Sequence, residues 1–208
     1  MFTSIFLKAI HNVWPMLFIF AVILVLLRLS YLFANKKKFV FYKEFIMLCF
    51  IIYILLLYYI VTFQDNNYGT NNFVPFREIF RYHYTFRLFV KNVVGNILLF
   101  IPFGIFTTRF IGRKKVLPTV LISIVVSCAI EFVQMRLGRT ADIDDIILNT
   151  TGGLIGALLY KFDTNILDKL PKFMQSEVFL DFVAILTITI LVYLAYKYNF
   201  WGVLTWII

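Results

Sequence analysis

The densest group of side chains that could do chemistry lies in residues 131–153, EFVQMRLGRTADIDDIILNTTGG. Carboxylates act as general acids or bases, or accept hydrogen bonds from a ligand, while amides and guanidinium groups orient polar partners. The same carboxylate and amide oxygens suit a hard divalent cation. The charged and amide residues of this stretch are Glu131, Gln134, Arg136, Arg139, Asp142, Asp144, Asp145 and Asn149. The whole chain is only 15% charged, so this concentration of charge has to be explained.

Helical spacing places the polar side chains on three short faces. Residues three, four or seven positions apart lie on the same side of a helix. The pattern gives one face each to Asn92 with Asn96, to Glu131 with Gln134, and to Asp142 with Asp145 and Asn149. Asp142 is equally suited to capping the following helix, because acidic groups stabilise helix N-termini. Asp144 and Arg136 are interpreted as ordinary interfacial charges.

The elements that must carry these faces are strongly apolar. The composition is 62% hydrophobic, with 25 Phe and 12 Tyr, well above the usual level for a globular protein. Six runs are of a length suited to spanning a hydrocarbon core of about 30 Å: residues 16–34, 45–63, 92–109, 117–135, 146–160 and 179–196. The predicted fold class is therefore all-α, a polytopic transmembrane helix bundle with about six spans.

Two other interpretations fit the apolar runs less well. A soluble bundle of buried helices does not need a run such as 45–63, which contains no charged residue. A cleaved signal peptide would end in small residues, whereas NKKK follows residues 16–34. The basic clusters NKKKF and GRKK then fall on the same side of the membrane, which predicts that side as cytoplasmic. The net charge of +9 is mostly such a topology signal, and no nucleic-acid partner is predicted.

The connection between the second and third spans differs from an ordinary linker. Residues 64–91, QDNNYGTNNFVPFREIFRYHYTFRLFVK, mix Asn, Gly and Pro with many Phe and Tyr residues. They are too apolar for a solvated loop and too interrupted for a span. We therefore expect an interfacial or re-entrant aromatic loop.

Depth in the membrane makes the polar faces costly. Glu131 and Asn96 lie inside their apolar runs, where an unpaired carboxylate costs several kcal/mol. Arg139 is the nearest candidate partner, and Arg77 in the aromatic loop is the second. The polar groups are thus expected to line one crevice open to the outside. Glycines 152, 153 and 156 are expected to let another backbone approach closely.

The order of three motifs resembles a known family. NVVGNILLFIPFG, then EFVQ, then GRTADIDDIILNTTGGLIG are similar to the signatures of VanZ-like proteins, and NNFVPFREI is similar to that family's loop with a Pro-Phe pair. The resemblance covers residues 45–160. It divides the chain into an N-terminal span with a basic cytoplasmic loop (1–44), the VanZ-like core (45–160), and a linker with a C-terminal span (161–208).

The resemblance implies a small multi-pass protein of the bacterial cell membrane, connected with the cell envelope. In some members it implies lower susceptibility to teicoplanin-type lipoglycopeptides, but it supplies no established reaction and no cofactor. The family's polar pattern falls on Asn92, Asn96, Glu131, Gln134, Arg139, Asp142, Asp145 and Asn149.

Two mechanisms of different classes remain open. In the first, which we favour narrowly, the crevice binds an amphiphile, either an envelope lipid or a lipoglycopeptide, and the aromatic loop holds its apolar part. The amides and the paired charges, with Arg77 among the binding residues, would hold the polar part. In the second, an intramembrane enzyme acts on a lipid-linked envelope precursor with Glu131 as general acid or base. A transporter fits less well, because no inverted repeat is evident.

Overall fold

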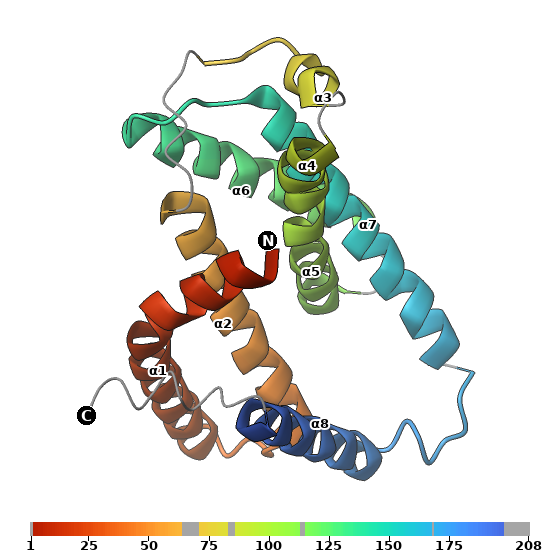
Figure 1. Ribbon diagram of the computed structural model, residues 1–208. Coiled ribbons are helices and arrows are strands. Elements are labelled where there is room, and N and C mark those ends of the chain that lie inside the picture. Colours follow the sequence, from red (N-terminus) through yellow and green to blue (C-terminus); the bar gives the residue numbers. More distant parts are fainter. Residues whose placement is uncertain (1, 64–70, 83–85, 113–114, 168, 198–208) are drawn as a thin grey trace. The chain divides into compact units, whose positions relative to one another are not determined.

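The computed structural model describes residues 2–63, 71–82, 86–112, 115–167 and 169–197. Regular structure in these residues is helical, apart from an isolated bridge between Asn72 and Asp142. The elements follow the order shown in Figure 1: α1 Phe2–Ala34, α2 Phe41–Phe63, α3 Arg77–Tyr82, α4 Phe86–Phe89, the π-helix η1 Val90–Val94, α5 Gly95–Ile111, α6 Val116–Arg136, α7 Ile143–Leu167 and α8 Glu177–Lys197. The predicted all-α membrane bundle is confirmed.

All six predicted spans fall on helices. Within the described ranges, three stretches are long and apolar enough to cross a membrane, namely Phe41–Ile60, Phe86–Ile111 and Val116–Arg136, and Phe18–Ala34 is a shorter apolar helix. The candidate third span runs from Phe86 to Ile111, so it starts six residues before the predicted start at residue 92. The sequence FRLFV continues the apolar run, and the α4, η1 and α5 segments follow one another without a break.

Helix α6 has the reverse of a soluble helix's pattern. Its polar residues Thr119, Ser123 and Ser127, at intervals of four, are fully buried. Leu121 and Val125, on another face, are 53% and 67% exposed. Polar groups facing inward and aliphatic groups facing outward are what a hydrocarbon solvent favours, because the polar groups find partners only within the protein.

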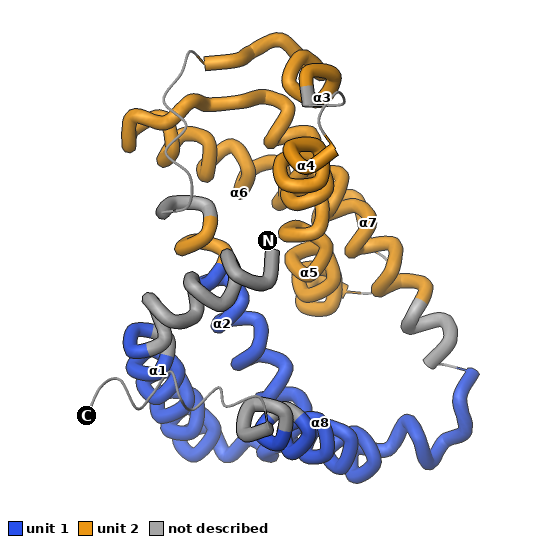
Figure 2. The backbone as a smooth tube through the Cα atoms, in the orientation of Figure 1, with its two compact units in different colours: residues 1, 3–56, 168–208 blue, residues 2, 57–167 orange. Residues whose placement is uncertain are grey.

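The described chain divides into two compact units, coloured separately in Figure 2. Apart from the first two residues, one unit comprises residues 3–56 and 168–208, and the other comprises residues 57–167. The second unit contains the polar stretch of residues 131–153. The division of the chain into the three predicted segments stays a prediction.

The first unit is joined by polar contacts between sequence-distant residues. The Arg28 guanidinium donates two hydrogen bonds to the Glu44 carboxylate, at 2.8 and 3.1 Å. The Glu177 carboxylate accepts from Lys38 and Lys43 at 2.9 and 3.0 Å, and these hydrogen bonds hold the pKa of Glu177 below its usual range. The contacts hold the start of α8 against the basic loop after α1.

Glycines permit very close packing in the second unit. A Cβ atom on Gly152 would lie 2.3 Å from the Ile97 carbonyl oxygen, and one on Gly156 would lie 2.1 Å from the Ile101 carbonyl oxygen. Helices α5 and α7 therefore run with their backbones in direct contact, as small residues allow in membranes. The predicted close approach at these glycines is confirmed.

The orientation of the bundle stays a prediction, and exposed residues at the two ends of α6 test it. In a variant lacking Cys49 and Cys128, cysteine introduced at Leu137 should react with a membrane-impermeant maleimide in intact cells. Cysteine introduced at Lys115 should react only after permeabilisation, because the basic cluster beside it is retained in the cytoplasm. Leu137 is 54% exposed and Lys115 is exposed. The opposite labelling pattern would reverse the assigned topology.

Candidate functional site

The end of α6 determines where Arg139 lies. The Gly138 N–H donates to the Met135 carbonyl at 3.2 Å, and the Arg139 N–H donates to the Gln134 carbonyl at 3.0 Å. These two bonds form a Schellman motif, with Gly138 in the left-handed conformation (φ 77°) that glycine adopts at little cost. The chain turns back at this point, which places Arg139 directly after the helix.

Three helices contribute polar side chains to one place in the second unit. The Glu131 Oε2 atom, on α6, accepts a hydrogen bond from the Asp142 backbone N–H at 2.8 Å. The Asn96 amide, on α5, donates to the Asp145 carboxylate at the start of α7. Arg139 lies within electrostatic range of both Glu131 and Asp145. The site therefore combines several carboxylates with an arginine and an amide.

The contact between α6 and α7 continues below the carboxylates as a polar ladder. The Asn149 amide donates to the Ser127 hydroxyl at 2.9 Å, and both residues are buried. One turn further, Ser123 lies so close to α7 that a Cβ on Gly153 would be 2.2 Å from its Oγ atom. The Ser123 hydroxyl donates back to the Thr119 carbonyl at 2.9 Å, which is how hydroxyls are satisfied inside membrane helices.

Asp142 caps α7 and also binds a distant segment. Its Oδ1 atom accepts from the Asp144 N–H at 2.9 Å, the geometry of an N-cap, and from the Asn72 amide at 3.0 Å. The Asn72 backbone pairs with both neighbours of Asp142, donating to the Ala141 carbonyl at 2.9 Å and accepting from the Ile143 N–H at 3.0 Å. Burial raises the pKa of Asp142, and the two hydrogen bonds partly oppose that rise.

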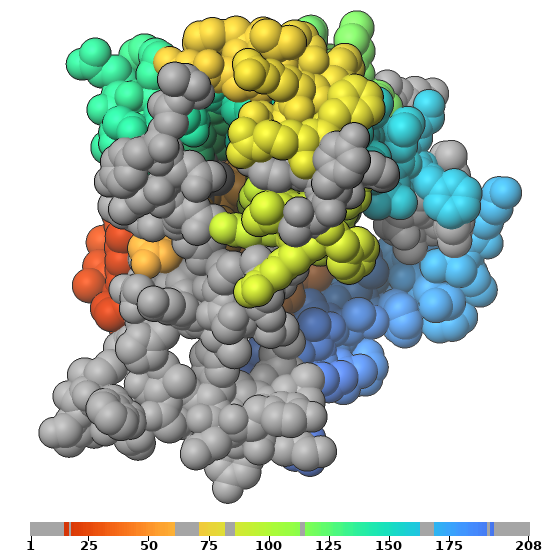
Figure 3. Space-filling model, turned by 45° about the horizontal axis from the view of Figure 1, so that its top comes forward, coloured from red at the N-terminus to blue at the C-terminus, as the bar shows by residue number. Residues whose placement is uncertain are grey.

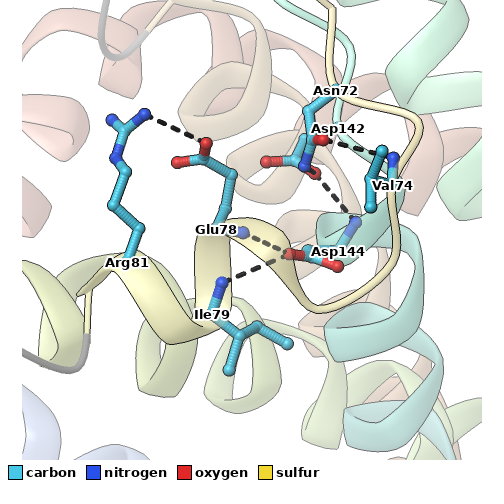
Figure 4. A network of polar contacts seen from close by, with 7 residues as sticks. All are labelled: Asn72, Val74, Glu78, Ile79, Arg81, Asp142 and Asp144. Atoms are coloured by element: carbon cyan, nitrogen blue, oxygen red, sulfur yellow. Dashed lines mark hydrogen bonds and ion pairs between the residues drawn. The ribbon is translucent and has the colours of Figure 1, made fainter.

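The Asp144 side chain is buried and binds the segment before and at the start of α3. It is 1% exposed, so the expectation of an ordinary interfacial charge was wrong. Its carboxylate accepts backbone hydrogen bonds from Phe76, from Glu78 at 2.8 Å and from Ile79 at 3.2 Å. Figure 4 shows the bonds to Glu78 and Ile79 at the start of α3. A carboxylate on α7 thus caps a helix that lies more than sixty residues earlier in the sequence.

The segment before α3 contains a strained residue. Phe76 has φ 65°, a conformation in which a bulky side chain is a genuine outlier. The Arg77 N–H donates to the Val74 carbonyl at 3.4 Å, so Pro75 and Phe76 form the centre of a turn whose third position favours glycine. The Phe76 N–H donates a hydrogen bond to the Asp144 carboxylate. The buried carboxylate therefore stabilises the turn.

The structure gathers most of the predicted site residues and leaves others apart. Asn96, Glu131, Asp142, Asp145 and Asn149 make hydrogen bonds at or beside the three-helix site, and Arg139 lies within electrostatic range of two of its carboxylates. Gln134 is buried on α6, and Asn92 is half-buried on η1. Arg77 is exposed at the first residue of α3. In the part of the chain that the structure describes, no group of three or more His, Cys, Asp or Glu side chains is placed to hold a metal ion.

Three further residues contact the predicted site residues: Asn72, Ser127 and Asp144. The interval of four from Ser123 through Ser127 to Glu131 could have indicated that the serine shares the glutamate's face. Asn72 and Asp144 had no such local signal, because their partners lie between 65 and 70 positions away.

Comparison with known proteins agrees with the order of the motifs. The VanZ/LLP1 family model matches residues 45–167, more than half of the chain. "Protein VanZ" from Enterococcus faecium is 35% identical over 72 residues, which is 34% of this chain and 44% of the relative. The match thus spans less than half of that relative's length. No solved structure matches the chain.

Proposed function

Because the chain belongs to the VanZ/LLP1 family of membrane proteins, we propose that its three-helix polar site binds the head of an amphiphile of the bacterial cell envelope. The ligand is an envelope lipid or a lipoglycopeptide, and binding lowers susceptibility to antibiotics of the teicoplanin type. The protein acts in the bacterial cell membrane as a multi-pass protein.

The observation that carries this proposal is the fixed arrangement of carboxylates at one end of α6 and α7. The Glu131 and Asp142 carboxylates each accept a hydrogen bond from a backbone N–H group, and the Asp145 carboxylate accepts one from the Asn96 side-chain amide. Carboxylates held in this way are pre-oriented acceptors, and pre-organisation favours binding because little ordering remains to be done. Each carboxylate oxygen has further lone pairs for a ligand's donors.

The charges indicate the chemistry of the head group. The Asp145 carboxylate lies within electrostatic range of the Glu131, Asp142 and Asp144 carboxylates and of the Arg139 guanidinium. An excess of acceptors favours a ligand that donates hydrogen bonds, such as the hydroxyls of a sugar or an amine. The exposed phenylalanines of residues 73–86 lie in the same unit and suit the apolar part of the same molecule.

An enzyme acting on a lipid-linked envelope precursor is the second candidate. Glu131 is 5% exposed and lies within electrostatic range of Asp145, and such a pair of carboxylates suits proton transfer. The described site offers less to a nucleophilic mechanism. The Ser127 hydroxyl accepts a hydrogen bond from the Asn149 amide. An amide is not a base, so it cannot activate this hydroxyl as a nucleophile.

Substitution of Glu131 separates the two candidates. Glu131→Gln keeps one acceptor for the Asp142 N–H but cannot exchange a proton. If the site only binds the head of an amphiphile, Glu131→Gln should keep part of the protection against teicoplanin in an expressing strain. Alanine should lose most of it, because the Asp142 N–H is left without its acceptor. If Glu131 is a general acid or base, Gln should lose about 10²–10⁴-fold in rate and therefore all of the protection.

The susceptibility assay needs controls for folding and for charge. Phe132→Ala changes the neighbouring residue, which is 59% exposed, and should leave protection unchanged at equal membrane abundance. Arg139→Lys keeps the positive charge but removes the planar fork, so it should weaken recognition more than it changes protein abundance. Wild-type protection in both Glu131 variants would overturn the role of this site under either candidate.

A further inference from the structure

We propose that residues 71–79, called here the strap, close the carboxylate site and release it when a ligand's hydrogen-bond donor replaces the Asn72 amide at Asp142. This role rests on the function proposed above, because the strap controls access to the same site. In the closed form, the Asn72 side-chain amide donates to the Asp142 carboxylate. The strap thus occupies an acceptor that a bound head group would use.

The strap is attached to the start of α7 through its backbone. The Asn72 N–H donates to the Ala141 carbonyl at 2.9 Å, and the Asn72 carbonyl accepts from the Ile143 N–H at 3.0 Å. These two bonds form an isolated parallel β-bridge. Further along, the strap donates three backbone hydrogen bonds to the Asp144 carboxylate. These partners all lie within residues 141–144, so one short segment holds the strap.

The strap covers the carboxylates at this end of the site. Asp144 is 1% exposed and Asn72 is 7% exposed, whereas residues 73–77 of the strap are exposed. Figure 4 shows the strap passing from Asn72 and Val74 around the Asp142 and Asp144 side chains to the start of α3. Figure 3 shows its yellow residues at the surface of the second unit. One layer of chain therefore lies between these carboxylates and the surface.

Asp142 connects the strap to the rest of the site. Its carboxylate accepts from the Asn72 side-chain amide at 3.0 Å, and its backbone N–H donates to the Glu131 carboxylate at 2.8 Å. Movement of the strap therefore shifts a residue that orients Glu131. A ligand that binds Asp142 in place of Asn72 releases the strap, and release of the strap favours that ligand in turn, because coupling between two equilibria is reciprocal.

The conformation of Phe76 favours release of the strap. Its φ of 65° is unfavourable for a bulky side chain, and its N–H is one of the three groups that donate to the Asp144 carboxylate. These bonds hold the turn in place, so the turn can relax once the strap leaves Asp144. Part of the free energy needed to break the hydrogen bonds is therefore recovered on opening.

The contact at Asp142 defines the chemistry of the group that releases the strap. An ionised carboxylate only accepts hydrogen bonds, so the group that replaces the Asn72 amide has to carry an N–H or O–H. Peptide amides and sugar hydroxyls meet this requirement, whereas a phosphate diester does not. The strap therefore favours the peptide or sugar part of an amphiphile over the phosphate of a phospholipid head.

A disulfide across the strap tests whether it controls access. In a variant lacking Cys49 and Cys128, the substitutions Asn71→Cys and Ala141→Cys place thiols on two residues already in contact, since the Asn71 side chain accepts from the Ala141 N–H at 3.0 Å. Both residues lie next to the bridge, where the two segments are close enough for a disulfide. Asn71→Cys alone, under the same oxidant, is the control.

Carbodiimide labelling measures access to the site. The full-length protein in phosphatidylcholine nanodiscs reacts with a water-soluble carbodiimide and an amine, and mass spectrometry gives the labelling rates of Glu131 and Asp145. Oxidation of the double variant should slow both rates at least about tenfold, because the strap can no longer open. Asn72→Ala should raise them about tenfold, since the Asp142 carboxylate loses a charge-assisted hydrogen bond. Glu177, in the other unit, should label equally in every form.

Two ligand probes separate the strap from the proposed function. Teicoplanin and a diglucosyl diacylglycerol are each supplied to reduced and to oxidised protein, and the probe that binds should slow labelling of Glu131 only in the reduced form. If neither probe has an effect while oxidation still slows labelling, the proposed ligand is wrong and the strap stands. Equal labelling of oxidised and reduced protein, or of Asn72→Ala and wild type, would overturn the strap.

Discussion

Asp144→Ala is expected to lower the free energy of unfolding by at least about 3 kcal/mol, because three backbone N–H groups lose a buried acceptor at about 1–3 kcal/mol each. These N–H groups belong to Phe76, Glu78 and Ile79. The effect should appear as a lower midpoint of denaturation in detergent. Asp144→Asn keeps one acceptor oxygen but adds a donor, so its loss should be intermediate.

Hydrogen exchange locates the same effect. The amides of Glu78 and Ile79 should be protected in the wild-type protein and should exchange rapidly in Asp144→Ala, since opening of this segment no longer breaks a hydrogen bond to a carboxylate. Glu177→Gln is the control for the exchange measurement, because it changes a carboxylate of the other unit that pairs with Lys38 and Lys43 and should leave exchange at residues 78 and 79 nearly unchanged. Unaltered exchange at residues 78 and 79 in Asp144→Ala would show that Asp144 does not hold α3.

Gly156→Ala is expected to destabilise the second unit by about 3 kcal/mol, near the upper end of the range for an overpacked core. A single methyl group would lie 2.1 Å from the Ile101 carbonyl oxygen, 2.9 Å from the Ile105 nitrogen and 3.0 Å from the Gly104 Cα. All three atoms belong to the backbone of α5, so no side chain can rotate away. The two helices must therefore separate.

Denaturation in mixed micelles measures this loss, and a second residue on α7 serves as its control. Leu158→Ala also introduces alanine but at a position that is 49% exposed, where substitutions usually change stability by less than about 0.5 kcal/mol. Gly152→Ala should resemble Gly156→Ala, because its Cβ would lie 2.3 Å from the Ile97 carbonyl. Equal stability of Gly156→Ala and Leu158→Ala would contradict the direct backbone contact.

Helical periodicity and apolar length made much of the fold predictable. A membrane-spanning helix makes its backbone hydrogen bonds within itself, so a long apolar run predicts where such a helix lies. The sequence thus predicted the all-α class, and the spacing of Gly152 and Gly156 predicted a close helix contact. The start of the third span was misplaced because Arg87 and Lys91 interrupt the run, although such long side chains can reach the interface from within a helix.

Local spacing also grouped the polar residues on the correct helices, but it did not choose their partners. Asp142 as a helix cap could be predicted, since the Asp144 N–H that it binds is two positions away. Asn96 with Asp145, Ser127 with Asn149 and Asn72 with Asp142 are separated by 49, 22 and 70 positions. Such pairs depend on which helices pack together and at which level.

Asp144 shows most clearly the difference between what the sequence predicts and what the tertiary structure decides. Its sequence neighbourhood, between Asp142 and Asp145, is that of an exposed acidic turn, and its burial follows only from the segment 71–79 lying over it. The sequence by itself determined the helices, because they follow from backbone geometry within a few residues. The tertiary structure alone decided which carboxylates are buried and what they bind, because burial and pairing are set by segments that meet in space and not along the chain.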